Sequence, residues 1–170
     1  MSEKPASPLG RYDRSAGDDE LHEVRLLNLP VRLLAAGREH HDELVHEFSL
    51  LAIADEEQRG SVPTRLLELV EALGARYAAA ERPDELVDEA LSRGEQVIDL
   101  TYRVPAHVVD AVDTLDRLMA EADAFCREER LLTPPRPPLI EQFSSWYLDE
   151  FRRQVAGAPP RAWDGPLDLR

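Results

Sequence analysis

The chain has 170 residues and a formal net charge of −14, with 20 basic and 34 acidic side chains. Nucleic acids and anionic membranes are bound through basic surfaces, so this composition argues against both as partners. With 43% hydrophobic and 32% charged residues, the sequence is typical of a single globular domain that is large enough to bury a core. An acidic surface also suits a partner protein with a basic face.

The N-terminal residues 1–20 are polar and contain two prolines, so we expect a disordered lead-in rather than a signal peptide. The sequence contains no run of about 20 apolar residues, the length that spans a bilayer. Cys126 is the only cysteine, which excludes an internal disulfide and fits a reducing compartment. These features predict a cytoplasmic protein.

The first expected element is a short strand at residues 24–28, where Val24 and Leu26 would share one face. A long helix is predicted to follow, from Pro30 to about Asp55, because apolar residues recur there at spacings of three and four. Its apolar stripe is expected to comprise Leu34, Gly37, His41, Leu44, Val45, Phe48, Leu51 and Ala52.

Two further helices and a strand are predicted next. One helix begins at Ser61, and a shorter one runs from Pro83 to a stop at Gly94. Residues 96–103 then alternate between apolar and polar, which predicts a second strand. Two isolated strands in a helical protein are expected to pair as a small ribbon, and the pattern leaves the direction of pairing open.

The region at residues 104–130 carries the longest apolar stripe, so the other helices are expected to pack against it. Pro105 would be its first helical residue, and Asp123 would face solvent with the other charged residues. A stiff, proline-rich connector at residues 132–138 separates this helix from a last helix at residues 139–156. The stripe of the longer helix is expected to comprise Val108, Ala111, Val112, Leu115, Leu118, Met119, Ala122, Phe125 and Cys126.

The predicted fold class is therefore mainly α, a bundle of about five helices with a small two-stranded β ribbon. We expect one helical domain at residues 21–157, preceded by the disordered lead-in at residues 1–20. A C-terminal tail at residues 158–170 is expected to pack on or near the last helix.

Four residues of the first long helix are candidates for chemistry. Glu43 and His46 match the Glu-x-x-His half-site of di-iron bundles, but the second half-site is missing and both residues fall on the polar side of the helix. His41 is expected to be buried on the apolar stripe, and His40 to be more exposed, beside Arg38. A phosphoacceptor histidine must be exposed and near a basic group, so His40 is the sharper candidate. The sequence has no Gly-rich phosphate loop and no Gly-x-Ser-x-Gly motif, and no metal site is expected.

The aromatic residues near the C-terminus form a second candidate site. Phe143, Trp146 and Tyr147 share a face of the last helix, and Trp163 lies in the tail among prolines and a glycine. Such a cluster is more often part of a core than of a binding site. Exposed Trp and Tyr residues are nevertheless typical anchors of interfaces, and Trp146 stands at the edge of its stripe. We therefore expect a partner-binding surface, if the protein has one, to include these four residues.

Several segments resemble a family of uncharacterised actinobacterial proteins, and the resemblance covers most of residues 22–165. The genes of this family lie near those of anti-sigma kinases, anti-sigma antagonists and serine phosphatases. The resemblance therefore implies partner-switching regulation, and it supplies no catalytic residues to transfer. The segments that carry it are Leu29–Phe48, Val97–Pro105, Glu121–Arg127, Trp146–Glu150, Gly157–Pro160 and Trp163–Gly165.

Together these observations predict a non-enzymatic regulatory protein that needs no cofactor and acts by binding another protein. The expected partner is an anti-sigma kinase, an antagonist or a phosphatase, and neither a nucleic acid nor a membrane. The alternative is a histidine phosphotransfer or metal-binding bundle that uses His40, His41, Glu43 and His46. A further alternative is a homodimer that shares the apolar stripe of residues 104–130.

Overall fold

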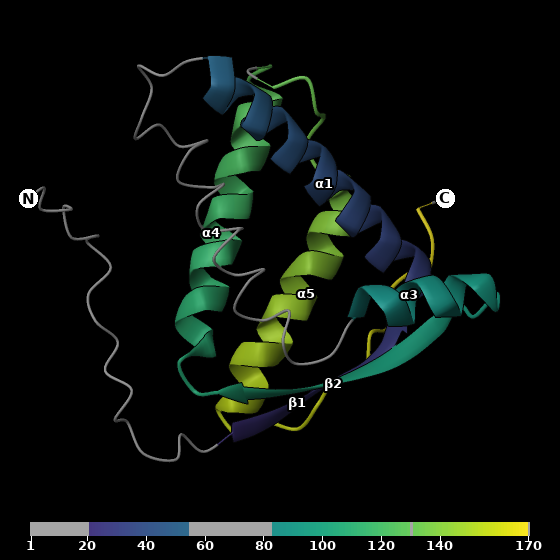
Figure 1. The fold of residues 1–170 in the computed structure, drawn as a ribbon. Helices are drawn as coiled ribbons and strands as arrows, with labels where there is room; N and C mark the ends of the chain where they lie inside the picture. The colour runs from purple at the N-terminus through teal and green to yellow at the C-terminus, as the bar shows by residue number, and fades with distance from the viewer. Residues whose placement is uncertain (1–20, 55–82, 130, 170) are drawn as a thin grey trace, which may run out of the picture.

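A computed structural model of the chain describes residues 21–54, 83–129 and 131–169 (Figure 1). This part of the chain is mainly α-helical, with four helices and one two-stranded antiparallel sheet. The expected lead-in and the helix predicted to begin at Ser61 lie outside the described residues, so the total of five helices stays a prediction. In chain order the elements are β1 (Leu21–Pro30), α1 (Val31–Ala54), α3 (Pro83–Ser92), β2 (Val97–Pro105), α4 (Val108–Arg127) and α5 (Pro138–Val155).

Most boundaries of these elements agree with the prediction to within a few residues. Gly94 and Gly157 follow the ends of α3 and α5 with φ of 70° and 89°, a left-handed conformation that glycine adopts without steric cost. The prediction for Pro105 is wrong, because Pro105 pairs with Leu21 as the last residue of β2 and α4 begins only at Val108. The fixed φ of proline suits the end of a strand as well as the start of a helix.

The ribbon is antiparallel, which settles the direction that the sequence left open. Its register shifts between Leu26 and Leu29, where β1 advances by three residues and β2 by two, so β1 carries a β-bulge. Asn28 lies in this bulge with φ of 60°, a value that asparagine tolerates better than most residues. The backbone amide of Asn28 donates a hydrogen bond to the side chain of Asp99 at 2.7 Å, which helps to hold the bulge.

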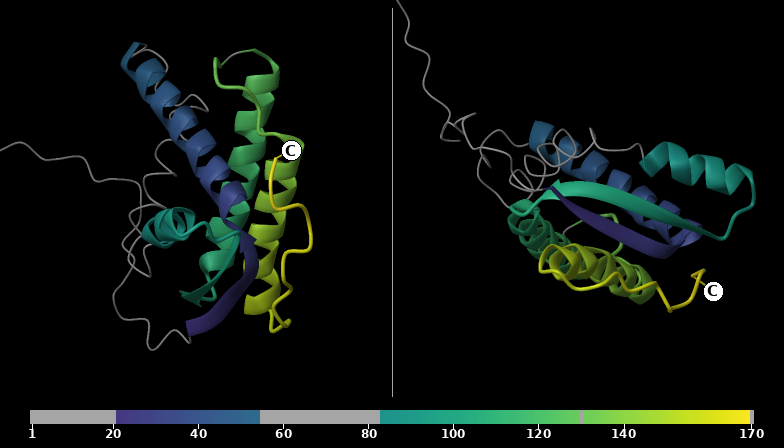
Figure 2. Two further views of the ribbon diagram at one scale, coloured as in Figure 1. Left: turned by 90° about the vertical axis from the view of Figure 1, so that its right-hand side faces the viewer. Right: turned by 90° about the horizontal axis from the view of Figure 1, so that it is seen from below.

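The helices stand on the ribbon, and α4 and α5 lie side by side with the ribbon across their lower ends (Figures 1 and 2). Helix α1 continues from β1 and crosses α5 at an angle, while α3 lies against α1 and β2. None of the four described helices is long and apolar enough to cross a membrane.

Among the described residues the hydrophobic core has three parts: a large part at the ribbon, a small part at the far end of the helices, and a cluster of Val31, Val87 and Ala90 where α3 meets the start of α1. The small part lies where the C-terminal half of α1 meets α4, and it includes Cys126, which is buried as predicted. The large part joins β1, β2, α1, α4, α5 and the tail. Its buried members are Val24, Leu26, Leu29, Leu33, Leu100, Val104, Val108, Val112, Ile140, Phe143, Trp146, Leu148, Phe151 and Trp163.

The tail runs back along α5 (Figure 2) and contacts β1 at Leu27 and Asn28. The backbone amide of Trp163 donates to the carbonyl of Leu27 at 3.0 Å, and the side-chain amide of Asn28 donates to the carbonyl of Trp163 at 2.7 Å. Gly165 lies so close to the indole of Trp163 that a Cβ atom would come within 2.4 Å of it. The tail thus satisfies the carbonyl group of Leu27, which an edge strand would leave unpaired.

We expect Trp163→Ala to lower the free energy of unfolding by about 3–5 kcal/mol, because the substitution removes a large side chain from the main core. Denaturant unfolding followed by circular dichroism measures this change. Leu169→Ala is the matched control in the same tail, since Leu169 is exposed and its truncation should change stability by less than about 0.5 kcal/mol. Equal effects of the two substitutions would contradict the placement of Trp163 in the core.

Candidate functional site

The aromatic residues expected at a partner-binding surface lie mostly inside the core. Trp146 is 9% exposed and Trp163 is 3% exposed, and their ring centroids are 5.4 Å apart. The ring of Phe143 contacts both, with centroids 5.8 Å and 5.3 Å away. Tyr147 is half-buried, and its hydroxyl group forms a hydrogen bond of 2.8 Å with that of Tyr102. Phe143, Trp146 and Trp163 therefore belong to the core, which was the commoner of the two interpretations of this cluster, and they lack the exposure that a partner-binding surface would need.

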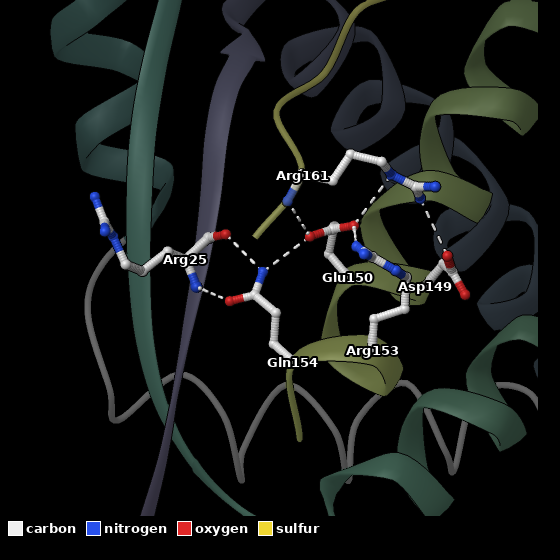
Figure 3. A network of polar contacts seen from close by, with 6 residues as sticks. All are labelled: Arg25, Asp149, Glu150, Arg153, Gln154 and Arg161. Carbon is white, nitrogen blue, oxygen red and sulfur yellow. Dashed lines mark hydrogen bonds and ion pairs between the residues drawn. The ribbon is translucent and has the colours of Figure 1, made fainter. Parts of the chain in front are cut away.

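A buried carboxylate of α5 lies beside this aromatic cluster, and Figure 3 shows its contacts. Glu150 is 0% exposed, and its Oε2 atom accepts hydrogen bonds from the backbone amide of Arg161 and from Gln154, both at 2.9 Å. Its Oε1 atom accepts a hydrogen bond from Arg153 and lies 3.3 Å from Nε of Arg161. Arg161 also pairs with Asp149 at 3.1 Å. These contacts fasten the tail to α5.

Gln154 extends this network to the ribbon. Its Oε1 atom accepts a hydrogen bond from the backbone amide of Arg25, and its Nε2 atom donates to the carbonyl of Arg25, both at 2.8 Å. The side-chain amide of Gln154 thus forms the two hydrogen bonds that a neighbouring strand would form with Arg25 at this edge of β1. Neither Glu150 nor Gln154 was predicted from the sequence to be buried, although both continue the helical spacing of Phe143 and Trp146 on the apolar face of α5.

The structure reverses the expected positions of His40 and His41. His41 is exposed, whereas His40 is half-buried, and its Nε2 atom is buried without a hydrogen-bond partner among the described residues. The buried side of α1 runs through Leu33, His40 and Leu44 rather than through His41. Both sets of residues fit a helical period of 3.6, so the pattern alone could not decide between them.

Burial is the largest influence on the pKa of His40, and it lowers that pKa below the ordinary value for histidine. Asp123 and Glu43 oppose the effect, whereas Arg136 and His41 add to it. His40 is therefore a half-buried, neutral imidazole at neutral pH. This is not the exposed imidazole near an available cation that was expected of a phosphoacceptor.

Glu43 and His46 come together on another side of α1, where they line a shallow hollow. Three of its six lining residues are carboxylates, and its one cation, Arg38, pairs with Asp88 of α3 at 2.7 Å. The negative charge there disfavours a phosphoryl group and favours a basic ligand. Within the part of the chain that the structure describes, no group of three His, Cys, Asp or Glu side chains could hold a metal ion. The hollow is lined by Ala35, Arg38, Glu39, Asp42, Glu43 and His46.

A buried ion pair joins α4 to the connector, and the sequence analysis missed it. Asp123 was predicted to face solvent but is 1% exposed, because the connector folds back against α4. Its Oδ2 atom accepts hydrogen bonds from Nε and Nη2 of Arg136 at 2.9 and 2.7 Å, and its Oδ1 atom accepts one from the backbone amide of Arg136 at 3.1 Å. Arg136 and Arg161 each follow two prolines, and this repeated Pro-Pro-Arg sequence was the available signal.

Glu47 of α1 holds the start of the connector. Its carboxylate accepts hydrogen bonds from the backbone amide of Leu132, and from the backbone amide and hydroxyl group of Thr133 at 2.8 and 2.7 Å. Burial raises the pKa of Glu47, but the three hydrogen bonds together outweigh this effect, so the pKa lies below its ordinary value. The connector is therefore fastened at two points, by Glu47 and by Asp123.

Cys126 lies close to this region and is buried in the small part of the core. Burial raises the pKa of its thiol, and the carboxylates of Asp123 and Glu47 raise it further. The thiol therefore stays protonated at neutral pH, which makes it a poor nucleophile and metal ligand.

No protein family, curated protein or solved structure matches the chain. The interpretation of the site therefore depends on the chemistry of its own residues.

We expect Arg136→Ala to lower the free energy of unfolding by about 3–5 kcal/mol, because it leaves the carboxylate of Asp123 buried without its cation. The double substitution Asp123→Leu and Arg136→Met should recover much of this loss, since an apolar pair of similar size removes both charges. Denaturant unfolding measures both effects. Arg32→Ala is the control, because its ion pair with Asp168 is exposed and should contribute less than about 1 kcal/mol. A loss for Arg136→Ala no larger than that of the control would contradict the buried pair.

The lowered pKa of His40 predicts a pH dependence of stability. The unfolded chain takes up a proton at this residue at a higher pH than the folded chain does, so stability should be complete above about pH 6.5 and fall as the pH decreases. His40→Leu should therefore lose less stability than the wild type between about pH 7.5 and pH 5.5. Urea midpoints at the two pH values measure this, and His46→Gln, at an exposed position, is the control that should behave like the wild type. An identical loss in His40→Leu would assign the pH dependence to other groups.

Proposed function

We propose that the protein is a non-enzymatic regulatory protein that acts by binding another protein. The observation that carries this proposal is that the buried polar side chains in the described part of the chain are all engaged in contacts that hold segments of the chain together. A catalytic acid, base or nucleophile has to remain available to a substrate, whereas these groups fix the connector or the tail against the helices. Among the described residues they are Asp123, Thr133, Arg136, Glu150 and Gln154.

The outer surface supports a protein partner with basic groups. The chain carries a net charge of −14, and Glu39, Asp42 and Glu43 stand together along the hollow of α1. Opposite charges on two proteins accelerate their association and suppress wrong partners. The resemblance of residues 29–48 and 97–105 supports a partner-switching pathway, in which the partner is an anti-sigma kinase, an antagonist or a serine phosphatase.

The alternative function, a histidine phosphotransfer or metal-binding bundle, has one supporting observation. His41 and His46 are both exposed on α1, as a phosphoacceptor would need to be. Glu43 lies near His46 in the hollow, where its negative charge would oppose a phosphoryl group. This alternative is tested together with the first proposal.

Affinity purification of the full-length, tagged protein from its own organism tests both functions. We expect mass spectrometry to find an anti-sigma kinase, antagonist or phosphatase in an amount comparable to the tagged protein, and none in a purification of the tag alone. The purified protein is also analysed for transition metals and for acid-labile phosphate. A stoichiometric metal or a phosphorylated His40, His41 or His46, without an associated protein, would overturn the proposal in favour of the alternative.

A further inference from the structure

The connector between α4 and α5 has a burial pattern with a period of three residues. Thr133 and Arg136 are buried, whereas Pro134 and Pro137 are exposed. A polyproline II helix has three residues per turn, so residues three apart lie on the same face. The connector therefore presents one face to the helices and one to solvent, at the end of the molecule where it joins the upper ends of α4 and α5 (Figure 2).

The sequence enforces this conformation locally. A residue that precedes proline is excluded from the α region by steric clash, and this applies to Thr133, Pro134, Arg136 and Pro137. The pyrrolidine ring also fixes φ of each proline near about −65°. Pro137 accordingly has φ of −56° and ψ of 145°, close to polyproline II values.

Two buried contacts make the inward face of the connector rigid. Glu47 binds Thr133, and Asp123 binds Arg136 through both its guanidinium group and its backbone amide. The outward face is held in place by these contacts but takes no part in them. Leu132 flanks this face, and its side chain is 96% exposed although its backbone amide is bound by Glu47. A segment that is already rigid loses little conformational entropy when a partner binds it.

We propose that the outward face of the connector, which is formed by Pro134 and Pro137 and flanked by the exposed side chain of Leu132, docks into a groove lined by aromatic side chains on a partner protein. This inference rests on the proposed function and names the surface that would perform it. Aromatic-lined grooves bind preformed polyproline II segments with prolines three residues apart. Pro134 and Pro137 have this spacing and share the exposed face.

The charges around the connector define the groove further. Arg136 is the only cation of the connector, and it is turned inward to pair with Asp123, so the groove needs no acidic pocket for it. Glu128 and Glu129 come shortly before the connector, but Arg127 and Arg130 flank them in the sequence, so the charges of this stretch balance. The groove should therefore recognise the connector mainly through its aromatic side chains.

Site-specific photo-crosslinking of the full-length protein in its own organism tests this inference. A photoreactive amino acid replaces Leu132 in one variant and Leu167 in the other, which is also exposed but lies in the tail. The position of Leu132 should crosslink to one protein, at a peptide that contains aromatic residues, and the position of Leu167 should not. Mass spectrometry of the crosslinked peptides identifies the protein and the groove.

In a second measurement, the partner that the crosslinking identifies is purified, and its Kd is determined for the wild-type chain and for variants of the chain. Pro134→Ala combined with Pro137→Ala should raise Kd at least about tenfold. Pro159→Ala combined with Pro160→Ala is the matched control, because these two prolines are exposed in the tail and should leave Kd unchanged. Thermal unfolding verifies that each variant folds, and Leu132→Ser, at a side chain outside the core, replaces the double substitution if that variant does not.

The outcomes separate this inference from the proposed function. A partner that crosslinks only at the position of Leu167, or that binds the connector variants as tightly as the wild type, overturns the docking surface and leaves the proposed function intact. A crosslink only to a second copy of this chain overturns the docking surface in favour of self-association. If no protein is crosslinked from either position and none is purified with the chain, both proposals fail.

Discussion

A carboxylate that is withdrawn from water must be compensated by hydrogen-bond donors and cations within the chain, and Glu150 meets this requirement with groups from more than one segment. Arg153 and Gln154 belong to its own helix, Arg161 belongs to the tail, and Gln154 in turn binds the backbone of β1. Because Arg161 fixes the path of the tail, its contacts with Glu150 also place Trp163, two residues later, in the core. The polar network and the apolar packing therefore depend on each other.

At the far end of the molecule, a second buried carboxylate binds an arginine of an irregular segment in the same way. Asp123 accepts hydrogen bonds from the backbone amide and the guanidinium group of Arg136. Glu150 likewise accepts a hydrogen bond from the backbone amide of Arg161 and forms an ion pair with its guanidinium group. In each case a helix supplies the buried carboxylate, and a non-helical segment supplies an arginine preceded by two prolines. The prolines stiffen the segment and the ion pair fixes where it lies. The fold thus uses its buried charges to give irregular segments a definite position.

The sequence predicted the elements of the described chain well, because helix periodicity, strand alternation and the glycine stops are local properties. It failed where the answer depends on a distant segment. Asp123 and Trp163 are buried only because the connector and the tail fold back. The choice between His40 and His41 depends on the rotation of α1 about its axis, which the packing of α4 and α5 determines. Of these errors, only the burial of Asp123 left a trace in the sequence, the Pro-Pro-Arg segment that contains its partner Arg136.

The topology of β1 also sets the kinetics of folding. The hydrogen bonds of Arg25 with Gln154 and of Asn28 with Trp163 join residues 129 and 135 positions apart. Closing loops of this size costs chain entropy before any native contact compensates for it. Although the described chain is mainly helical, it should therefore fold more slowly than an up-and-down helical bundle of the same length, with the helices forming early and the ribbon end closing late.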